Sequence, residues 1–333
     1  MDAMVLENCA FVETSPLVHK ELPDSVAQDA EVVVRVGACG VCHTDLHIIE
    51  GELPPHRLPL VPGHQVVGRV EEVGPGVEDI QAGDFVGTPW LHRPCGKCRF
   101  CRSDRENLCL EPLFTGWDVD GGFAGRMKAS VEAVYHLPQG YSDAECAPLL
   151  CGGVIGYRAY RLSKAREGET LGIFGFGSSA HLVLQMALHE GVKVFVFTRS
   201  EHHRELALEL GAAFAGKAEE EPPRLLDAAI VFAPVGTLAK RALELSSPGS
   251  RVVTAGIYST PIPELPYPLI YGERSLLSAA NSTRRDVREL LSLAGELRFQ
   301  VTVETFPLHE ANQALLDLKK SRLQASAVLV MND

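Results

Sequence analysis

The chain has 333 residues, of which 46% are hydrophobic and 22% charged, and its formal net charge is −12. This length predicts about two domains, and the acidic balance argues against a nucleic acid or an anionic membrane as partner, because both need a basic face. The N-terminal residues lack the basic and apolar segments of a secretory signal, and no apolar run reaches the ~18 residues of a membrane helix. We therefore expect a cytoplasmic protein, in which the nine cysteines stay reduced and serve as metal ligands, nucleophiles or core residues.

The chain changes character near residue 145. Before it, short β runs such as 31–38 and the strand–turn–strand segment 68–90 are interrupted by Gly and Pro, which is typical of an antiparallel barrel or sandwich. After it, apolar strands such as 170–177 and 192–197 alternate with helices, which predicts a parallel sheet with right-handed crossovers. The last residues add a helix and a final strand, and the pattern alone leaves open which domain they join.

Four cysteines follow one another with gaps of two, two and seven residues: Cys95, Cys98, Cys101 and Cys109. Four thiolates in a reducing compartment can complete a tetrahedral zinc shell on one loop. The spacing differs from the ferredoxin patterns, and a redox CxxC pair would stand alone at the start of a helix. We predict a structural zinc here, and because its shell is full, we expect the chemistry to take place elsewhere.

The sequence GFGSSA lies between an apolar strand and a helical pattern and fits the dinucleotide motif G-x-G-x-x-G/A. Gly175 makes the tight turn, Gly177 lets a pyrophosphate approach the backbone, and Ala180 lets the helix pack closely on the strand. Ser178 and Ser179 open the helix whose N-terminus would hold the anion. The motif predicts a dinucleotide-binding site.

The residues after the next strand bear on the choice of dinucleotide. An NAD site usually has Asp or Glu there, ~20 residues after the glycines, to bond the ribose hydroxyls. Here the strand ends in Thr198, Arg199 and Ser200. Two hydroxyls and a guanidinium suit a 2′-phosphate, so NADP(H) is favoured over NAD(H). In the alternative interpretation, Arg199 is a solvated loop residue and Glu201 serves the ribose.

Several segments together resemble the zinc-containing medium-chain alcohol dehydrogenase family, over essentially the whole chain. They are, in the family's order, GVCHTDLH, PGH, the four-cysteine loop, APLLCGG and GFGSSA. The overall sequence resembles the propanol-preferring and cinnamyl-like branches of the family more than the polyol dehydrogenases. The resemblance implies a GroES-like β-rich catalytic domain formed by residues 1–145 and 286–333, with a Rossmann doubly wound parallel-sheet domain at 146–285 between them. It also implies a homodimer or homotetramer.

The resemblance further implies two zinc ions per chain. Cys42, His64 and Cys151 correspond to the three ligands of a catalytic zinc, and the four-cysteine loop corresponds to the structural zinc. Spacing alone would not have joined these three residues. Gln65 stands where most relatives carry Glu directly after the zinc-ligating His, which puts the role of that carboxylate in ligand exchange in doubt.

By the same resemblance, three residues near Cys42 manage the substrate's proton and the metal ligand. Thr44 corresponds to the hydroxyl that accepts the proton, His47 to the end of the relay to solvent, and Asp45 to the carboxylate that orients His64. These roles agree with the chemistry, because zinc lowers the pKa of a bound oxygen and His titrates near neutrality.

The substrate pocket is the least specified part of the sequence. Trp90 matches a pocket aromatic of the family, and Trp117 and Leu53 are further candidates, with a plain core role as the alternative for all three. An apolar pocket beside zinc suits a primary alcohol or aldehyde.

The sequence favours a zinc alcohol dehydrogenase or aldehyde reductase over two other functions. A zinc-free quinone or enone reductase of the same superfamily predicts neither set of metal ligands. A non-enzymatic zinc and nucleotide binding module agrees poorly with the charge of −12 and with the intact pair Thr44 and His47.

Overall fold

The computed structural model describes residues 1–323 and 326–331. The chain divides into two compact units, one made of Met1–Cys151 with Asn281–Asp333 and the other of Gly152–Ala280. We call them the catalytic unit and the nucleotide unit. The first division comes after the expected boundary at 145 and the second before the expected boundary at 285. Residues 324–325 and 332–333, within the expected C-terminal segment, lie outside the described residues.

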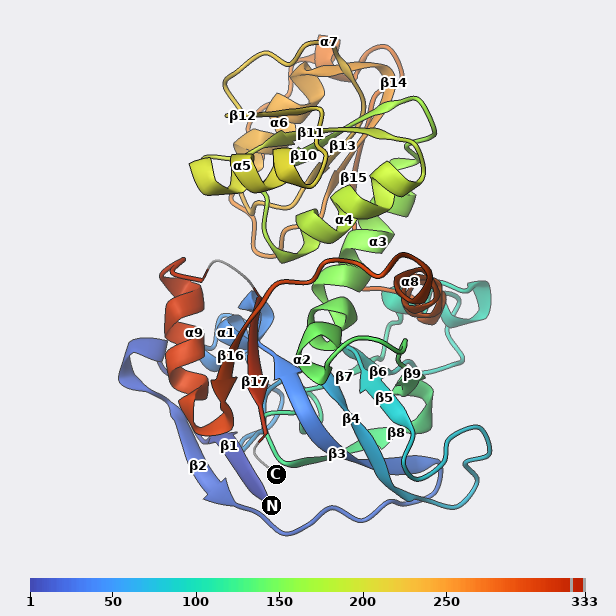
Figure 1. The fold of residues 1–333 in the computed structure, drawn as a ribbon, viewed down its shortest axis with the longest axis vertical. Helices are drawn as coiled ribbons and strands as arrows, with labels where there is room; N and C mark the ends of the chain where they lie inside the picture. Colours follow the sequence, from blue (N-terminus) through green and yellow to red (C-terminus); the bar gives the residue numbers. More distant parts are fainter. Residues whose placement is uncertain (324–325, 332–333) are drawn as a thin grey trace. The chain divides into compact units, whose positions relative to one another are not determined.

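The catalytic unit is built on one large sheet in the strand order β16-β17-β3-β4-β5-β9, with β8 also paired to β3. Its strands are β3 (Glu31–Gly40), β4 (Gln65–Val73), β5 (Phe85–Thr88), β8 (Arg126–Ser130), β9 (Tyr135–His136), β16 (Val303–Pro307) and β17 (Ser326–Val330). β17 runs antiparallel to β3, with Leu329 opposite Cys39 (Figure 1). The C-terminal strand thus completes the sheet begun near the N-terminus.

Shorter elements surround this sheet. The remaining strands are β1 (Asp2–Leu6), β2 (Leu17–Glu21), β6 (Leu91–Arg93) and β7 (Leu113–Phe114). The helices are α1 (His43–Ile49), α2 (Asp143–Cys146), α8 (Arg284–Leu297) and α9 (Ala311–Lys319). Among the described residues, no helix has the length and apolar character needed to cross a bilayer.

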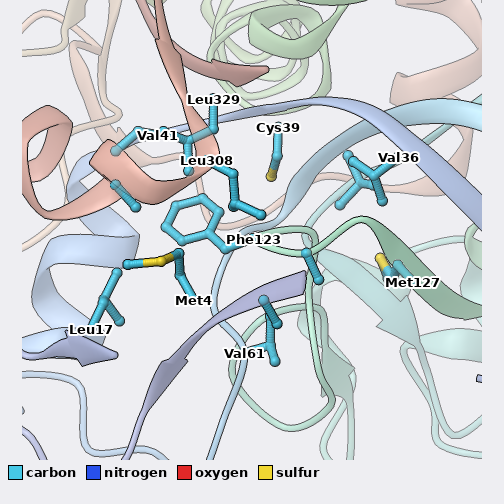
Figure 2. Packing of buried hydrophobic residues seen from close by; sticks show 14 of the residues in the cluster. Met4, Leu17, Val36, Cys39, Val41, Val61, Phe123, Met127, Leu308 and Leu329 are labelled. Atoms are coloured by element: carbon cyan, nitrogen blue, oxygen red, sulfur yellow. The ribbon is translucent and has the colours of Figure 1, made fainter. Parts of the chain in front are cut away.

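Phe123 lies at the centre of the hydrophobic core of the catalytic unit. Its side chain is fully buried and is surrounded by side chains that include Met4, Val41 and Leu308 (Figure 2). The same core contains Cys39, also fully buried. Burial of such apolar area contributes about 25 cal/mol per Å² to stability. This core lies directly beneath the loop that carries His64.

The nucleotide unit contains a six-stranded parallel sheet in the order β12-β11-β10-β13-β14-β15 (Figure 1). The strands are β10 (Thr170–Phe174), β11 (Lys193–Phe197), β12 (Phe214–Gly216), β13 (Leu226–Val231), β14 (Ser246–Thr254) and β15 (Ser275–Ser278). The helices are α3 (Gly152–Ser163), α4 (Ser178–His189), α5 (Glu201–Glu209), α6 (Gly236–Glu244) and α7 (Tyr267–Ile270). All five residues of β10 are buried, as expected for a parallel strand covered by helices on both faces.

From β10 the chain adds β11 and β12 on one side of the sheet, and it then adds β13, β14 and β15 on the other side. The direction in which strands are added therefore changes between β10 and β13. In doubly wound sheets, this switch point is where a dinucleotide binds, outside the carboxyl ends of the strands. The loop after β10 is GFGSSA. The fold therefore places the glycine motif at the position where such a motif can hold a pyrophosphate.

Candidate metal centres and nucleotide site

The start of α1 fixes the position of Cys42. Cys42 is the N-cap residue, and its Sγ accepts a hydrogen bond from the Thr44 amide at 3.3 Å. Its own amide donates to Oδ2 of Asp45 at 2.9 Å, which completes a capping box. The hydrogen bonds that cap helix α1 therefore also hold Cys42, a candidate metal ligand, in place.

His64 is placed by the turn that precedes β4. Gly63 has a φ of +98°, and a Cβ at this position would lie 2.4 Å from the Phe123 ring, so only glycine fits here. The His64 side chain is 1% exposed. Its Nδ1 lies 2.9 Å from Oδ1 of Asp45, which is fully buried. A carboxylate at Nδ1 leaves Nε2 as the nitrogen that can face a metal.

The two sulfurs and this nitrogen converge on one point. Nε2 of His64 lies 3.4 Å from Sγ of Cys42 and 3.4 Å from Sγ of Cys151, and the two sulfurs are 4.0 Å apart. Zinc–sulfur bonds of about 2.3 Å and zinc–nitrogen bonds of about 2.0 Å in a tetrahedron would put these atoms roughly 3.5–3.8 Å apart. The donor set therefore fits a zinc ion. His64 is buried while both cysteines are partly exposed, so one side of the set remains open.

The surroundings of Cys42 and His64 favour the protonated forms of both side chains. Hydrogen bonding to Cys151 and burial raise the pKa of the Cys42 thiol well above its usual range. Burial opposes a charged His64, but the Asp45 carboxylate and Cys42 raise the pKa of His64 well above its usual range. A bound metal would replace these protons, because metal ligands must be deprotonated.

The four cysteines of the loop form a second cluster, whose ligand atoms all lie within 4.8 Å of one another. Sγ of Cys101 is 3.5 Å from that of Cys98 and 3.9 Å from that of Cys95. The amides of Cys101 and Leu110 lower the pKa of Cys98 to about 6, whereas burial and the neighbouring thiols raise the pKa of Cys101 to about 12. Four soft donors at this spacing fit a closed tetrahedral zinc site.

The relay candidates Thr44 and His47 lie one turn apart on α1. Residues three apart share one face of a helix. Nδ1 of His47 contacts Oε2 of Glu52, a residue that the sequence patterns did not single out. The one sequence feature that could have indicated this contact is Gly51. Its φ of +79° turns the chain at the end of α1, so that Glu52 lies beside the last turn of that helix.

The glycine loop has the geometry that its sequence predicts. Gly175 has a φ of +88°, and a Cβ there would lie 2.9 Å from the Ala233 amide, whereas a Cβ at Gly177 would have no neighbour within 4 Å. Gly177 is the N-cap residue of α4 and makes no side-chain capping hydrogen bond. Ala180 is fully buried. This open helix N-terminus fits a pyrophosphate.

The end of β11 presents an exposed cation. Arg199 and Ser200 are exposed, and Thr198 is half-buried. Nη1 of Arg204 donates to the carbonyl oxygens of Thr198 at 3.1 Å and Arg199 at 2.9 Å, and so holds the backbone of this turn. Ser200 caps α5 by accepting a hydrogen bond from the His203 amide.

Comparison with known proteins decides the family. Residues 28–139 match the family described as "Alcohol dehydrogenase GroES-like domain", and residues 180–296 match "Zinc-binding dehydrogenase". The probable alcohol dehydrogenase AdhA of Mycobacterium tuberculosis is 44% identical over 337 residues, which cover 99% of this chain and 97% of that protein. The chain belongs to the zinc-containing medium-chain alcohol dehydrogenase family.

Other relatives agree with this assignment. An alcohol dehydrogenase of Geobacillus stearothermophilus is 35% identical, with 94% of this chain and 95% of that protein covered. The structure of a cinnamyl alcohol dehydrogenase from Sorghum bicolor is 29% identical with a TM-score of 0.89, covering 99% of this chain and 97% of the other. The predicted family and fold class, a GroES-like domain with a Rossmann domain, are therefore confirmed.

In this family member, Gln65 is buried and uncharged. It begins β4 opposite Gly40, and a Cβ at Gly40 would lie 2.7 Å from the Gln65 amide. The Gln65 side chain is 4% exposed. Its amide therefore packs against the backbone of β3, in the space that the missing side chain of Gly40 provides.

Aromatic rings form a wall beside His64. The ring of Trp90 meets that of His64 edge-on at 5.1 Å and stacks on Phe114 at 4.7 Å and on Trp117 at 5.9 Å. The structure thus brings two of the three expected pocket residues together, and Leu53 packs against the adjoining core. Phe114 was missed, because no motif marks it; its contact with Trp90 comes from the pairing of β6 with β7.

Proposed function

We propose that this chain catalyses hydride transfer between a primary alcohol or aldehyde and NADP(H), with two zinc ions per chain. The observation that carries the proposal is the convergence of Cys42, His64 and Cys151, with the Thr44 amide bonded to Sγ of Cys42, separate from the four-cysteine cluster. Three protein ligands leave a fourth position for substrate, whereas four do not.

The zinc, when bound, supplies a Lewis acid for the substrate oxygen, and the nicotinamide supplies the hydride chemistry. The chain's own residues hold and move the proton. Thr44 accepts the proton of the alcohol, and His47, one helical turn away, passes it toward solvent. Asp45 holds the His64 ring by the 2.9 Å contact and keeps Nε2 directed at the two sulfurs.

The aromatic wall supports an apolar substrate. Trp90 borders His64, and Phe114 and Trp117 extend the wall by stacking. Such faces bury an aliphatic or aromatic group and exclude water from the reacting oxygen. The half-buried Leu53 adds aliphatic surface. A primary alcohol or aldehyde with an apolar tail is the substrate class that we propose.

The preference for NADP(H) rests on the end of β11. Arg199 is exposed there, and the Thr198 and Ser200 hydroxyls flank it. A guanidinium pairs well with a phosphate, and residues 198–200, which follow the strand, contain no carboxylate. Glu201 begins α5 one residue further on and is the alternative ribose partner.

We propose a homodimer or homotetramer in the cytoplasm. Exposed apolar side chains gather in one segment of the nucleotide unit, with Tyr258, Tyr267 and Tyr271 53%, 73% and 68% exposed. Such a segment favours contact with another subunit. All nine cysteines are free, and the seven in the two clusters need a reducing compartment to bind metal.

One pair of measurements tests the main proposal. Zinc content per chain is measured together with oxidation of NADPH and of NADH in the presence of propanal or cinnamaldehyde. Two zinc ions with faster turnover of NADPH support it. Absence of zinc with reduction of an enone would favour a quinone or enone reductase, and one zinc with no turnover would favour a binding module.

The cofactor preference has its own variant. Replacing Arg199 with Ala should raise the KM for NADPH by about tenfold or more and leave the KM for NADH nearly unchanged, since only NADPH carries the 2′-phosphate. Arg166→Ala, which removes an exposed arginine elsewhere in the nucleotide unit, is the matched control. Equal effects of Arg199→Ala on both cofactors would contradict an NADP(H) site.

A further inference from the structure

We infer that Glu52 is the outer residue of the proton relay, where it sets the tautomer of His47 and hands the proton to solvent. The inference rests on the proposed function, which makes His47 a relay group. It is carried by a contact that neither the motifs nor the family comparison assigned: Nδ1 of His47 lies against Oε2 of Glu52.

The local backbone explains why these two residues meet. Helix α1 ends at Ile49, and the Gly51 turn, with a φ of +79°, reverses the chain. The Leu53 amide then donates to the His47 carbonyl oxygen at 2.9 Å, which fixes Glu52 beside the last turn of the helix. A Cβ at Gly51 would lie 3.2 Å from Cys9, so the turn is also restricted by packing.

Exposure gives the relay a direction. The His47 side chain is 15% exposed, whereas that of Glu52 is 53% exposed. Glu52 thus reaches water more fully than His47 does. The step from His47 to Glu52 leads from one environment to the other.

The other carboxylates near α1 are engaged elsewhere. Both oxygens of Asp45 are used, by His64 and by the Cys42 amide.

Glu50 is 7% exposed and accepts from Lys319 of α9 at 2.7 Å and from the Val12 amide at 2.8 Å. Lys319 also pairs with Glu13, and the His43 ring lies 6.5 Å from that of His47. Glu52 is thus the carboxylate in a position to take the Nδ1 proton.

The chemistry follows from the two nitrogens of the ring. With the proton on Nδ1 donated to the Glu52 carboxylate, Nε2 is the ring nitrogen with a lone pair that can accept a proton. A proton that arrives at Nε2 makes the ring cationic, and the Nδ1 proton then leaves to Glu52 and from there to water. This leaves the Nε2–H tautomer, and exchange of the ring protons with water restores the Nδ1–H form before the next turnover. Reduction of an aldehyde runs the same transfers in reverse. Glu52 is therefore a positioning residue, because it acts through His47.

The test combines spectroscopy with kinetics on the full-length holoprotein. With ¹⁵N-labelled histidine, and His47→Gln to assign the signal, the wild-type His47 ring should be mainly the Nδ1–H tautomer. Glu52→Ala should lower the Nδ1–H fraction about twofold or more. Glu52→Gln and Glu52→Ala should each lower kcat for alcohol oxidation by roughly tenfold, with KM and zinc content unchanged. Glu52→Asp should restore part of kcat.

Glu78→Gln is the matched control, since it neutralises an exposed carboxylate of the same unit far along the chain, and it should leave both readouts unchanged. An unchanged tautomer together with an unchanged kcat in Glu52→Ala overturns the inference, as does a loss of thermal stability without either change. Wild-type protein that turns over no alcohol or aldehyde would contradict the proposed function instead, and the tautomer measurement would still decide whether Glu52 controls His47.

Discussion

Asp45 and His64 form a buried pair in which Oδ1 lies 2.9 Å from Nδ1, and the other carboxylate oxygen of Asp45 accepts the Cys42 amide at 2.9 Å. One side chain therefore positions two ligands of the proposed catalytic zinc. Asp45→Asn should weaken zinc binding at this site by about 10- to 100-fold, because an amide cannot accept both hydrogen bonds and carries no charge to support the imidazole.

Chelator competition, with the released zinc counted per chain, measures this effect. Asp79→Asn, which changes an exposed aspartate in the loop after β4, is the control and should leave the affinity unchanged. If Asp45→Asn released its zinc no more readily than Asp79→Asn, the buried pair would have no role in holding the metal.

The two metal clusters should respond differently to the loss of one ligand. Cys98→Ala should remove the zinc that folds the polar loop and lower the thermal unfolding temperature, since structural zinc contributes on the order of 10 kcal/mol to folding in small domains. Cys42→Ala should abolish turnover and remove one zinc, with a smaller fall in the unfolding temperature than Cys98→Ala, of the size expected from loss of the α1 cap. Zinc analysis, melting curves and turnover of the two variants check this. Loss of stability alone in both variants would show that our division into structural and catalytic clusters is wrong.

Much of the fold could be predicted from local patterns. The four-cysteine spacing, the GFGSSA turn and the alternation of strands with helices each depend on residues close in sequence. The sequence patterns did not predict strands β12 and β15, because segments of three and four residues are too short to show a periodic pattern. The pairing of β17 with β3 joins opposite ends of the chain, and the family resemblance implied only that the last residues return to the catalytic domain.

The proposed catalytic site shows the limit more clearly. His64 and Cys151 are 87 residues apart in sequence, yet their ligand atoms lie 3.4 Å apart, because β4 and the turn before Cys151 belong to one packed unit. A motif defined by residue spacing cannot predict a contact between residues so far apart in the sequence. Glu52 was missed for a related reason, since its contact with His47 depends on the backbone turn at Gly51 rather than on a motif.

Gly63 connects the hydrophobic core to the metal site, and its replacement should be costly. A Cβ there would lie 2.4 Å from Phe123 and 2.9 Å from Sγ of Cys39, both fully buried, and the φ of +98° disfavours any other residue. Gly63→Ala should lower the free energy of unfolding by about 3 kcal/mol, from backbone strain and overpacking together. Urea unfolding measures it.

Gly83 separates the two causes. Its φ is +93°, but a Cβ there meets nothing within 4 Å. Gly83→Ala should therefore cost only about 1 kcal/mol, from the backbone alone. Equal losses in the two variants would mean that the contact with Phe123 contributes nothing.

His92 should make the stability of the chain depend on pH. Its side chain is buried in β6, and its Nδ1 has no hydrogen-bond partner among the described residues. Burial, with a contribution from Arg93, lowers the pKa of His92 to about 4. The folded state therefore binds its proton at a lower pH than the unfolded state does. Full stability is expected above pH ~6.5, and it should fall as the pH drops toward 4, by about 2–3 kcal/mol in all.

Urea unfolding of wild type and His92→Gln at pH 7 and pH 4.5 tests this. The difference between the two proteins removes any loss common to both, including metal released as cysteine ligands are protonated. The variant should lose about 2 kcal/mol less than wild type between the two pH values. His136→Gln, at a side chain that is 59% exposed, should behave as wild type does. An equal loss in His92→Gln and wild type would show that His92 is not the group that titrates.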